Sequence, residues 1–430
     1  MNTTAILILL VSFAVMIVIG FHISYSMMAA ASLTILYLGL SPTQIINTMV
    51  DGVDGFTFLA IPFFILSGDI MARGGISDRL ILLADAMVGW MRGGLAMVNI
   101  VASIFFGGIS GSASADTASL GAILIPMMDK QGYDKEFATA VTMTSSVQGM
   151  LIPPSHNMII YAMAAGGISV SALFMAGLVP GVFLGVALMV FCYYLSVKRN
   201  YPKGTPFTLK NLWFAVRKSI WGLGTVIIVV VGVVMGVFTA TESAAIACVY
   251  ALVVSMAGYR EMNGKDLFGV VKSSVKTLST VLVLIAASGP FGFCITYLKI
   301  PEMVVNGMLG LTDSKFLILL MINLIILVLG TILGMASIIV IVTPILMPVL
   351  LSIGFSPIQF GAVLILNCGI GLITPPVGGV LFIGSGISGV PIERLFKHTL
   401  PLIGVMAVVL LMITYIPEIT LTLPRILGLL

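Results

Sequence analysis

The stretch FFGGISGSASADTASLGAILIPMM (residues 105–128), followed by TSSVQGMLIPPSHN (144–157), decides the fold because the chain contains it twice. The second copy reads LVLGTILGMASIIVIVTPILMPVL (327–350) and LNCGIGLITPPVGG (366–379), 222 positions later. At that one offset, several pairs align: Gly330 with Gly108, Pro348 with Pro126, Asn367 with Ser145, Gly371 with Gly149, and Pro375-Pro376 with Pro153-Pro154. Agreement at a single spacing predicts an internal duplication.

Each copy is an apolar segment broken by Gly, Ser or Thr, followed by an apolar segment broken by Pro-Pro. In hydrocarbon, an interrupted backbone is tolerated only where it is buried in protein or lines a cavity. Paired interruptions in two halves of a chain are typical of the binding site of a transporter.

The composition is that of an integral membrane protein. The chain is 59% hydrophobic and 8% charged, with a mean hydropathy of +1.19, and its repeated long apolar runs predict membrane-spanning helices. The first 50 residues contain no Asp, Glu, Lys or Arg, so we expect a first span rather than a signal peptide.

The four cysteines lie in apolar runs, where we expect packed side chains rather than a disulfide or a metal site. The scattered basic residues give no nucleic-acid signature.

The polar linker 197–218 divides the halves, since it carries basic but no acidic residues. We expect an all-α membrane protein with these parts: scaffold spans at 1–72, an interfacial arm helix at 73–92, transport elements at 93–167 and a span at 168–196, then scaffold spans at 219–298, a second arm at 299–315, transport elements at 316–390 and a last span at 391–430. The arm prediction rests on apolar residues at helical spacing, from Ile76 to Trp90, which suit a helix in the membrane interface. An ordinary amphipathic loop helix is the alternative.

Charge predicts the topology. If the linker is cytoplasmic and each interrupted pair is a re-entrant hairpin, 17 of the 20 basic residues lie inside, and only Lys299, Lys315 and Arg425 lie outside. Each half then has five crossings and one hairpin, so the halves are inverted relative to each other. The amino terminus then lies outside. The two hairpin tips are expected to meet near the midplane, as in inverted-repeat transporters.

The broken segments supply oxygen atoms. Proline removes an amide hydrogen and interrupts the preceding turn, which leaves carbonyl groups without partners. Carbonyls and hydroxyls with at most one carboxylate suit Na⁺, by analogy with other hard cations. The predicted Na⁺ site residues are Ser110, Ser112, Ser114, Asp116, Ser145 and Gly149 in the first copy, and Gly330, Gly334, Ser337, Asn367, Gly371 and Thr374 in the second. The predicted substrate-binding residues are Pro154, Ser155, His156, Asn157, Thr343 and Pro376. Close helix packing by small residues is the alternative.

Three charged or titratable groups have competing interpretations. Asp116 is the one carboxylate expected deep in an apolar stretch, which favours a functional role over a cap on its own hairpin backbone. His156 either contacts an anionic substrate or is a hydrogen-bonded residue in the break. Asp69 and Arg73 are four residues apart at a span end, where we expect an ordinary helix-end pair.

Two missing motifs limit the chemistry. The sequence has no GxxxxGK[ST], which argues against ATP hydrolysis at a Walker site, and no HExxH. We therefore expect no enzyme activity and no cofactor other than a coupling ion.

The motifs SGSASAD (110–116), IPPS (152–155), TPP (374–376) and IPFFILSGDIM (61–71) resemble those of the large membrane subunit, the M or DctM type, of tripartite ATP-independent periplasmic (TRAP) transporters. The resemblance covers essentially the whole chain and is nearest to the sialic-acid branch. His156-Asn157 departs from the family pattern, in which more apolar residues follow IPPS.

The resemblance implies a Na⁺-coupled symporter in the bacterial inner membrane that imports an organic acid, of the sialic acid or C4-dicarboxylate class, by an elevator mechanism. It also implies a small four-helix membrane subunit and a periplasmic substrate-binding protein as partners. The alternatives are a C4-dicarboxylate/cation symporter without a binding protein, a membrane scaffold or channel, and an intramembrane enzyme, for which the sequence shows no catalytic dyad.

Overall fold

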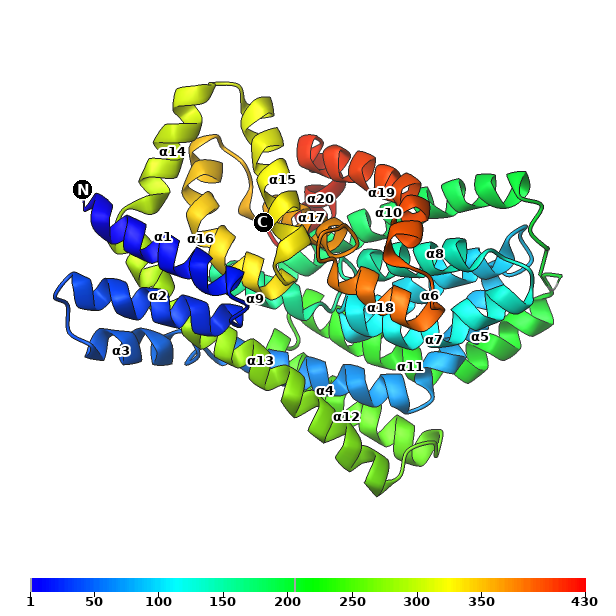
Figure 1. Ribbon diagram of the computed structural model, residues 1–430. Helices are drawn as coiled ribbons and strands as arrows, with labels where there is room; N and C mark the ends of the chain where they lie inside the picture. Colours follow the sequence, from blue (N-terminus) through cyan, green and yellow to red (C-terminus); the bar gives the residue numbers. More distant parts are fainter. Residues whose placement is uncertain (1, 205) are drawn as a thin grey trace.

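The computed structural model describes residues 2–204 and 206–430, and the elements assigned in them are helices (Figure 1). Those of the first half are α1 (Thr3–Val18), α2 (Ile23–Tyr37), α3 (Thr43–Asp51), the 3-10 helix η1 (Phe56–Leu59), α4 (Ala60–Arg73), α5 (Ile76–Val88), α6 (Gly94–Ser110), α7 (Ala113–Lys130), α8 (Lys135–Gly149), α9 (His156–Ala164) and α10 (Val170–Lys198).

Those of the second half are α11 (Leu209–Val234), α12 (Ala240–Val253), the π-helix η2 (Val254–Gly258), α13 (Gly264–Tyr297), α14 (Ile300–Leu311), α15 (Lys315–Ile332), α16 (Met335–Ser352), α17 (Pro357–Leu372), α18 (Gly379–Ser388), α19 (Ile392–Tyr415) and α20 (Pro417–Ile426). Within the described residues, seven helices are long and apolar enough to cross a membrane: α10, α11, α12 with η2, α13, α15, α16 and α19. The predicted all-α membrane fold is confirmed.

The duplication appears as a repeated order of helices. The first hairpin, α6 and α7, breaks at Gly111, and the second, α15 and α16, breaks at Leu333, 222 positions later. The Pro-broken segments are likewise paired, with α8 and α9 in the first half and α17 and α18 in the second. The Pro153-Pro154 and Pro375-Pro376 peptide bonds are both cis.

Packing between the halves is reciprocal, as expected for repeats related by a two-fold axis. The second arm of each hairpin packs on the far part of the other half's broken segment, α7 on α18 and α16 on α9. The long helix that ends each half packs on the other broken segment, α10 on α17 and α19 on α8. Helices α4 and α13, which contact each other, pack on α12 and α2 respectively.

These contacts separate two groups of helices, which we call the core and the wall. The core contains the hairpins, the broken segments, α10 and α19. The wall contains α1–α4 and α11–α13, with α1–α3 at one end of the molecule (Figure 1). Helix α5 packs on both α6 and α11, and α14 packs on both α13 and α16, so each bridges the two groups.

Local sequence explains where the hairpin and span helices begin. Gly111 ends α6 in a left-handed conformation (φ 59°) that few other residues adopt readily, and the Ser112 side chain then caps α7 by accepting from the Ala115 amide. In the wall, α12 and α13 each begin with a capping box, Thr239 with Glu242 and Asn263 with Asp266.

Candidate functional site

The tip of the first hairpin holds a buried carboxylate. Asp116 lies in the first turn of α7 and is 0% exposed. The Ser110 hydroxyl, at the end of α6, donates to Asp116 Oδ1, and the Ser112 amide donates to Ser110 Oγ at 3.0 Å. The carboxylate is therefore held by a side chain across the break and does not cap its own backbone amides, so that alternative is not supported.

The first broken segment packs directly on this tip. A Cβ added at Gly107 would lie 2.2 Å from the Gly149 carbonyl oxygen, so α6 and α8 approach each other backbone to backbone. Asn157 Nδ2, on α9, donates to the Gly111 carbonyl at 3.0 Å. Gly149 and Asn157 thus position the hairpin, and His156 lies beside Gly111.

Several oxygen atoms in this region are buried and have no protein hydrogen-bond partner. They include Asp116 Oδ2, Thr117 Oγ1 and Ser155 Oγ in the first half, and Thr343 Oγ1 and Asn367 Oδ1 in the second. Asp116 Oδ2 and the Ser103 carbonyl oxygen lie 2.9 and 3.0 Å from the position of a Gly149 Cβ, so these oxygens converge beside Gly149. A hard cation such as Na⁺ fits such oxygen atoms.

Ser145 belongs to a polar network that fastens α6 to α8. Ser103 Oγ donates to Ser145 Oγ at 2.9 Å, Ser145 Oγ donates to Asn99 Oδ1 at 3.3 Å, and Asn99 Nδ2 donates to Thr142 Oγ1 at 2.6 Å. Sequence reasoning missed Asn99, Ser103 and Thr142. The sequence signal that could have found them is the presence of polar residues within otherwise apolar helices.

The second half has an analogous network. Asn367 Nδ2 donates to both the carbonyl and the Oδ1 of Asn323 at 2.8 Å, and Asn323 Nδ2 donates to Thr414 Oγ1 at 3.2 Å. Asn323, another residue that the sequence analysis missed, thus links α15 to α17 and α19. Nearby, a Cβ added at Gly371 would lie 2.4 Å from the Gly330 carbonyl carbon. This backbone contact resembles that of Gly107 with Gly149, although the sequence alignment pairs Gly330 with Gly108.

The remaining predicted site residues are less closely grouped. Ser337, Thr343, Pro154 and Ser155 are buried, whereas Gly334 and Pro376 are exposed. Thr374 donates to the Ile370 carbonyl in its own helical turn at 2.7 Å. Ser112 and Ser114 are half-buried and face a cavity rather than the converging oxygens.

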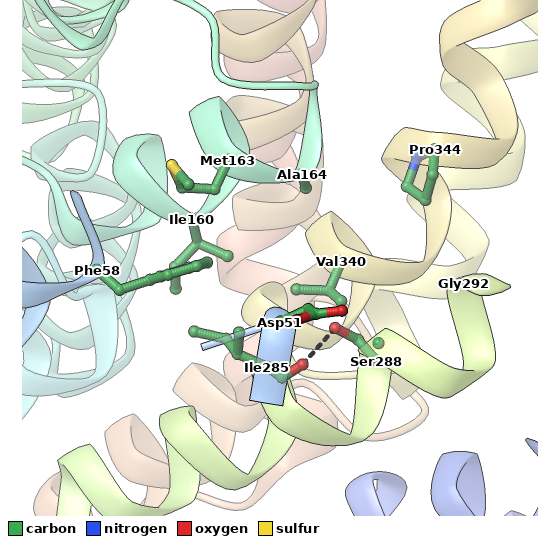
Figure 2. A pocket seen from close by; sticks show the side chains of 12 residues that line it. Asp51, Phe58, Ile160, Met163, Ala164, Ile285, Ser288, Gly292, Val340 and Pro344 are labelled. Atoms are coloured by element: carbon green, nitrogen blue, oxygen red, sulfur yellow. Dashed lines mark hydrogen bonds between the residues drawn. The ribbon is translucent and has the colours of Figure 1, made fainter. Parts of the chain in front are cut away.

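Two cavities lie between the core and the wall, which also touch directly where α4 packs on α6 and α13 packs on α16. One, of about 500 Å³, lies beside the first hairpin tip and is lined from the core by Ser110, Ser112, Ser114 and His156 and from the wall by Asp69, Arg73 and Thr277, among others. With the predicted topology it opens toward the cytoplasm, and we call it the inner cavity. The other, of about 330 Å³, lies between α9, α13 and α16 and includes Asp51, Met163 and Ser288 (Figure 2). We call it the outer cavity.

Comparison with known families decides what kind of protein carries these cavities. Residues 10–419 match the model of the tripartite ATP-independent periplasmic transporter, DctM component. The chain belongs to this family. It is therefore the large permease subunit of a TRAP transporter, a multi-pass inner-membrane transport protein and not an enzyme.

Curated relatives of this DctM-family chain differ in their substrates. The chain is 36% identical to the 2,3-diketo-L-gulonate TRAP transporter large permease protein of Escherichia coli, over 94% of this chain and 95% of the relative. It is 35% identical to the sialic acid TRAP transporter large permease protein of Vibrio cholerae, over 88% of each. It is 40% identical to the isethionate TRAP transporter permease protein DctMQ of Oleidesulfovibrio alaskensis, over 95% of this chain and 64% of that longer protein.

A solved structure supports the fold. The YdaH transporter of Alcanivorax borkumensis aligns with a TM-score of 0.63 at 15% identity, over 89% of this chain and 88% of that one. The similarity shows that this DctM-family chain shares the fold of that transporter over the aligned part.

Proposed function

We propose that this TRAP permease subunit couples the import of an organic acid to Na⁺ entry, with the core carrying both across the membrane along the wall. The observation that supports Na⁺ coupling is the buried Asp116 carboxylate, whose second oxygen has no hydrogen-bond partner among the described residues and converges with the Ser103 carbonyl beside Gly149. A charged carboxylate in a membrane segment is costly unless a counter-charge is near, and a bound cation supplies one.

The proposed partners are a small membrane subunit and a periplasmic substrate-binding protein. The fused DctMQ relative supports the first, because it extends well beyond the region that this chain matches. The exposed apolar faces of α1 and α11, in the wall, offer the small subunit a surface without interrupted backbone. The substrate is an organic acid, and sialic acid and a C4-dicarboxylate are the two candidates that the sequence favours.

The test is uptake by proteoliposomes that contain the chain, a small membrane subunit and a substrate-binding protein. We expect uptake to require an inward Na⁺ gradient, to be unaffected by ATP, and to be lost when the binding protein is omitted. Equal uptake with K⁺ in place of Na⁺ would show that the coupling is wrong. Robust high-affinity uptake by the purified chain alone would instead favour a symporter that needs no binding protein.

A further inference from the structure

Arg73, at the end of α4, does not form the helix-end pair that the sequence suggested. Asp69 Oδ2 instead accepts a hydrogen bond from Ser274 Oγ of α13 at 2.6 Å, which joins the two wall helices. Within the described part of the chain, Arg73 has no ion pair, and its side chain is exposed. Asp69 and Arg73 therefore form no direct ion pair, although the charge of Arg73 still acts on the Asp69 carboxylate. No ion pair within the described residues holds the guanidinium, which leaves it free to contact a ligand as well.

This guanidinium lines the inner cavity. Ser112, Ser114 and Ser119 of the first hairpin line the same cavity from the core, and Ser273 and Thr277 of α13 line it from the wall. An anion in this space would meet hydroxyl donors on the core and the Arg73 cation on the wall, beside the Asp69 carboxylate that accepts from Ser274. Guanidinium groups bind carboxylates and similar oxyanions through two parallel hydrogen bonds.

Among the described residues, the outer cavity has no cationic side chain in its lining, whereas the inner cavity has Arg73 beside the carboxylate of Asp69. The lining of the outer cavity includes the carboxylate of Asp51 and no basic residue. The Ser288 hydroxyl, which also lines it, donates a hydrogen bond to the Ile285 carbonyl at 2.6 Å (Figure 2). An organic anion therefore finds a cationic partner in the inner cavity and none in the outer one.

We propose that Arg73 binds the anionic group of the substrate on the cytoplasmic side, so that the substrate bridges the first hairpin and the wall before release. This inference rests on the proposed function. Because Arg73 belongs to the wall and the hairpin belongs to the core, the two form one site only while the core faces inward. Arg73 then sets the affinity on the cytoplasmic face and leaves the affinity on the periplasmic face unchanged.

The experiment is counterflow in right-side-out proteoliposomes that contain the complete transporter. The lumen is loaded with sialic acid, succinate, 2,3-diketo-L-gulonate or isethionate, and the acid that the wild type exchanges is then titrated on each face. For Arg73→Gln we expect the luminal half-saturating concentration to rise about tenfold, the loss typical of removing one charge-assisted hydrogen-bonding partner. The external half-saturating concentration, measured with the binding protein, should stay unchanged, and Arg73→Lys should fall between wild type and Arg73→Gln.

Lys130→Gln is the matched control, because Lys130 ends α7 on the same predicted side of the membrane and does not line the inner cavity. Arg73→Met removes the charge with an apolar side chain about as long as Gln and replaces Arg73→Gln if that variant does not fold. An unchanged luminal half-saturating concentration, or an equal rise on both faces or in Lys130→Gln, would overturn the inference and leave the proposed function standing. Absence of Na⁺-dependent exchange by the wild type with all four acids would overturn the proposed function itself.

Discussion

At the scale of single residues, Asp116 is the group whose energetics most need an explanation. It is fully buried, Ser110 satisfies one of its oxygens, and its other oxygen lies beside the glycine contact between α6 and α8. Burying a carboxylate with one unsatisfied oxygen is unfavourable unless a cation or a proton binds it. Binding of Na⁺ and binding of H⁺ at Asp116 would make transport respond differently to substitutions around this carboxylate.

Ser110→Ala removes the donor that orients the Asp116 carboxylate. We expect the Na⁺ concentration for half-maximal uptake to rise about three- to tenfold, as for the loss of one hydrogen bond to a charged group, with substrate affinity less affected. Ser337→Ala should act in the same direction in the second half. Ser32→Ala is the control, since Ser32 lies in α2 of the wall and its hydroxyl donates to the Met28 carbonyl of the same helix at 2.7 Å. Unchanged Na⁺ dependence in both Ser110→Ala and Ser337→Ala would show that the ion sites are elsewhere.

Substitution of two glycines of the second half, one in close backbone contact and one in open space, tests how packing affects thermal stability. An added Cβ at Gly371 would meet the backbone of Gly330 at 2.4 Å, whereas at Gly334 it would meet nothing within 4 Å. Gly371→Ala must therefore push α15 away from α17 and should cost about 1–3 kcal/mol, as overpacking does. The thermal unfolding midpoint in detergent should fall for Gly371→Ala and stay near wild type for Gly334→Ala. Equal midpoints would contradict the backbone contact.

At the scale of elements, the two bridging helices are fixed differently. Helix α5 is fixed to the wall by Arg79. Its Nη2 forms an ion pair with Glu261 Oε1 at 2.6 Å, and its guanidinium carbon lies 3.7 Å from the centre of the Tyr259 ring. Its carbonyl accepts a hydrogen bond from Ser219 Oγ at 2.6 Å. Helix α14 buries only Ile300 and Met308, and the ion pair at its start, Lys299 with Glu302, is largely exposed at 3.6 Å. The first arm is therefore anchored to the wall more firmly than the second.

Hydrogen exchange along the arms tests this difference. Glu261→Gln breaks the ion pair of Arg79 and leaves the partly buried guanidinium without its acid, so we expect faster amide exchange in residues 76–88. Glu302→Gln removes an exposed pair worth about 0–1 kcal/mol and should leave the exchange of α14 unchanged. Equal effects of the two substitutions on their own arms would contradict the stronger anchoring of α5.

At the scale of the whole molecule, the question is which helices move together. The core is joined across its halves by the reciprocal packing of α7 on α18 and α16 on α9, and by the ion pair of Arg394 with Glu136 at 2.6 Å. Separating these elements would expose interrupted backbone, at a cost of several kcal/mol for each unsatisfied group, roughly. Moving the core as one body along the wall exposes none of it.

Crosslinks distinguish these motions. A flexible bis-maleimide between cysteines at positions 136 and 394 joins two parts of the core, and transport should continue. A link between cysteines at 108 and 226 joins the first hairpin to the wall, where the Val226 side chain lies 3.3 Å from a Cβ at Gly108, and transport should stop. Both pairs belong in a background without the four native cysteines, all of which are buried and free. Loss of transport with the first link and normal transport with the second would rule out the elevator motion.

The sequence alone determined the architecture, because apolar length, chain breaks and their repetition are local properties that can be read along one segment at a time. Gly111, Pro153-Pro154 and their counterparts marked the broken elements, and the contact of Asn157 with Gly111 brings the first hairpin and its broken segment together as expected. Inversion of the halves and re-entry of the hairpins stay predictions from charge.

Only the tertiary structure decided which polar groups find each other. Asp69 was expected to pair with Arg73, four residues away, but its hydrogen-bond partner is Ser274, which lies 205 positions along the chain. Asn323 and Asn99 joined the networks of Asn367 and Ser145 for the same reason, since each partner is on a different helix. A pattern read along one helix shows which face is polar, whereas the partner of that face depends on how distant helices pack.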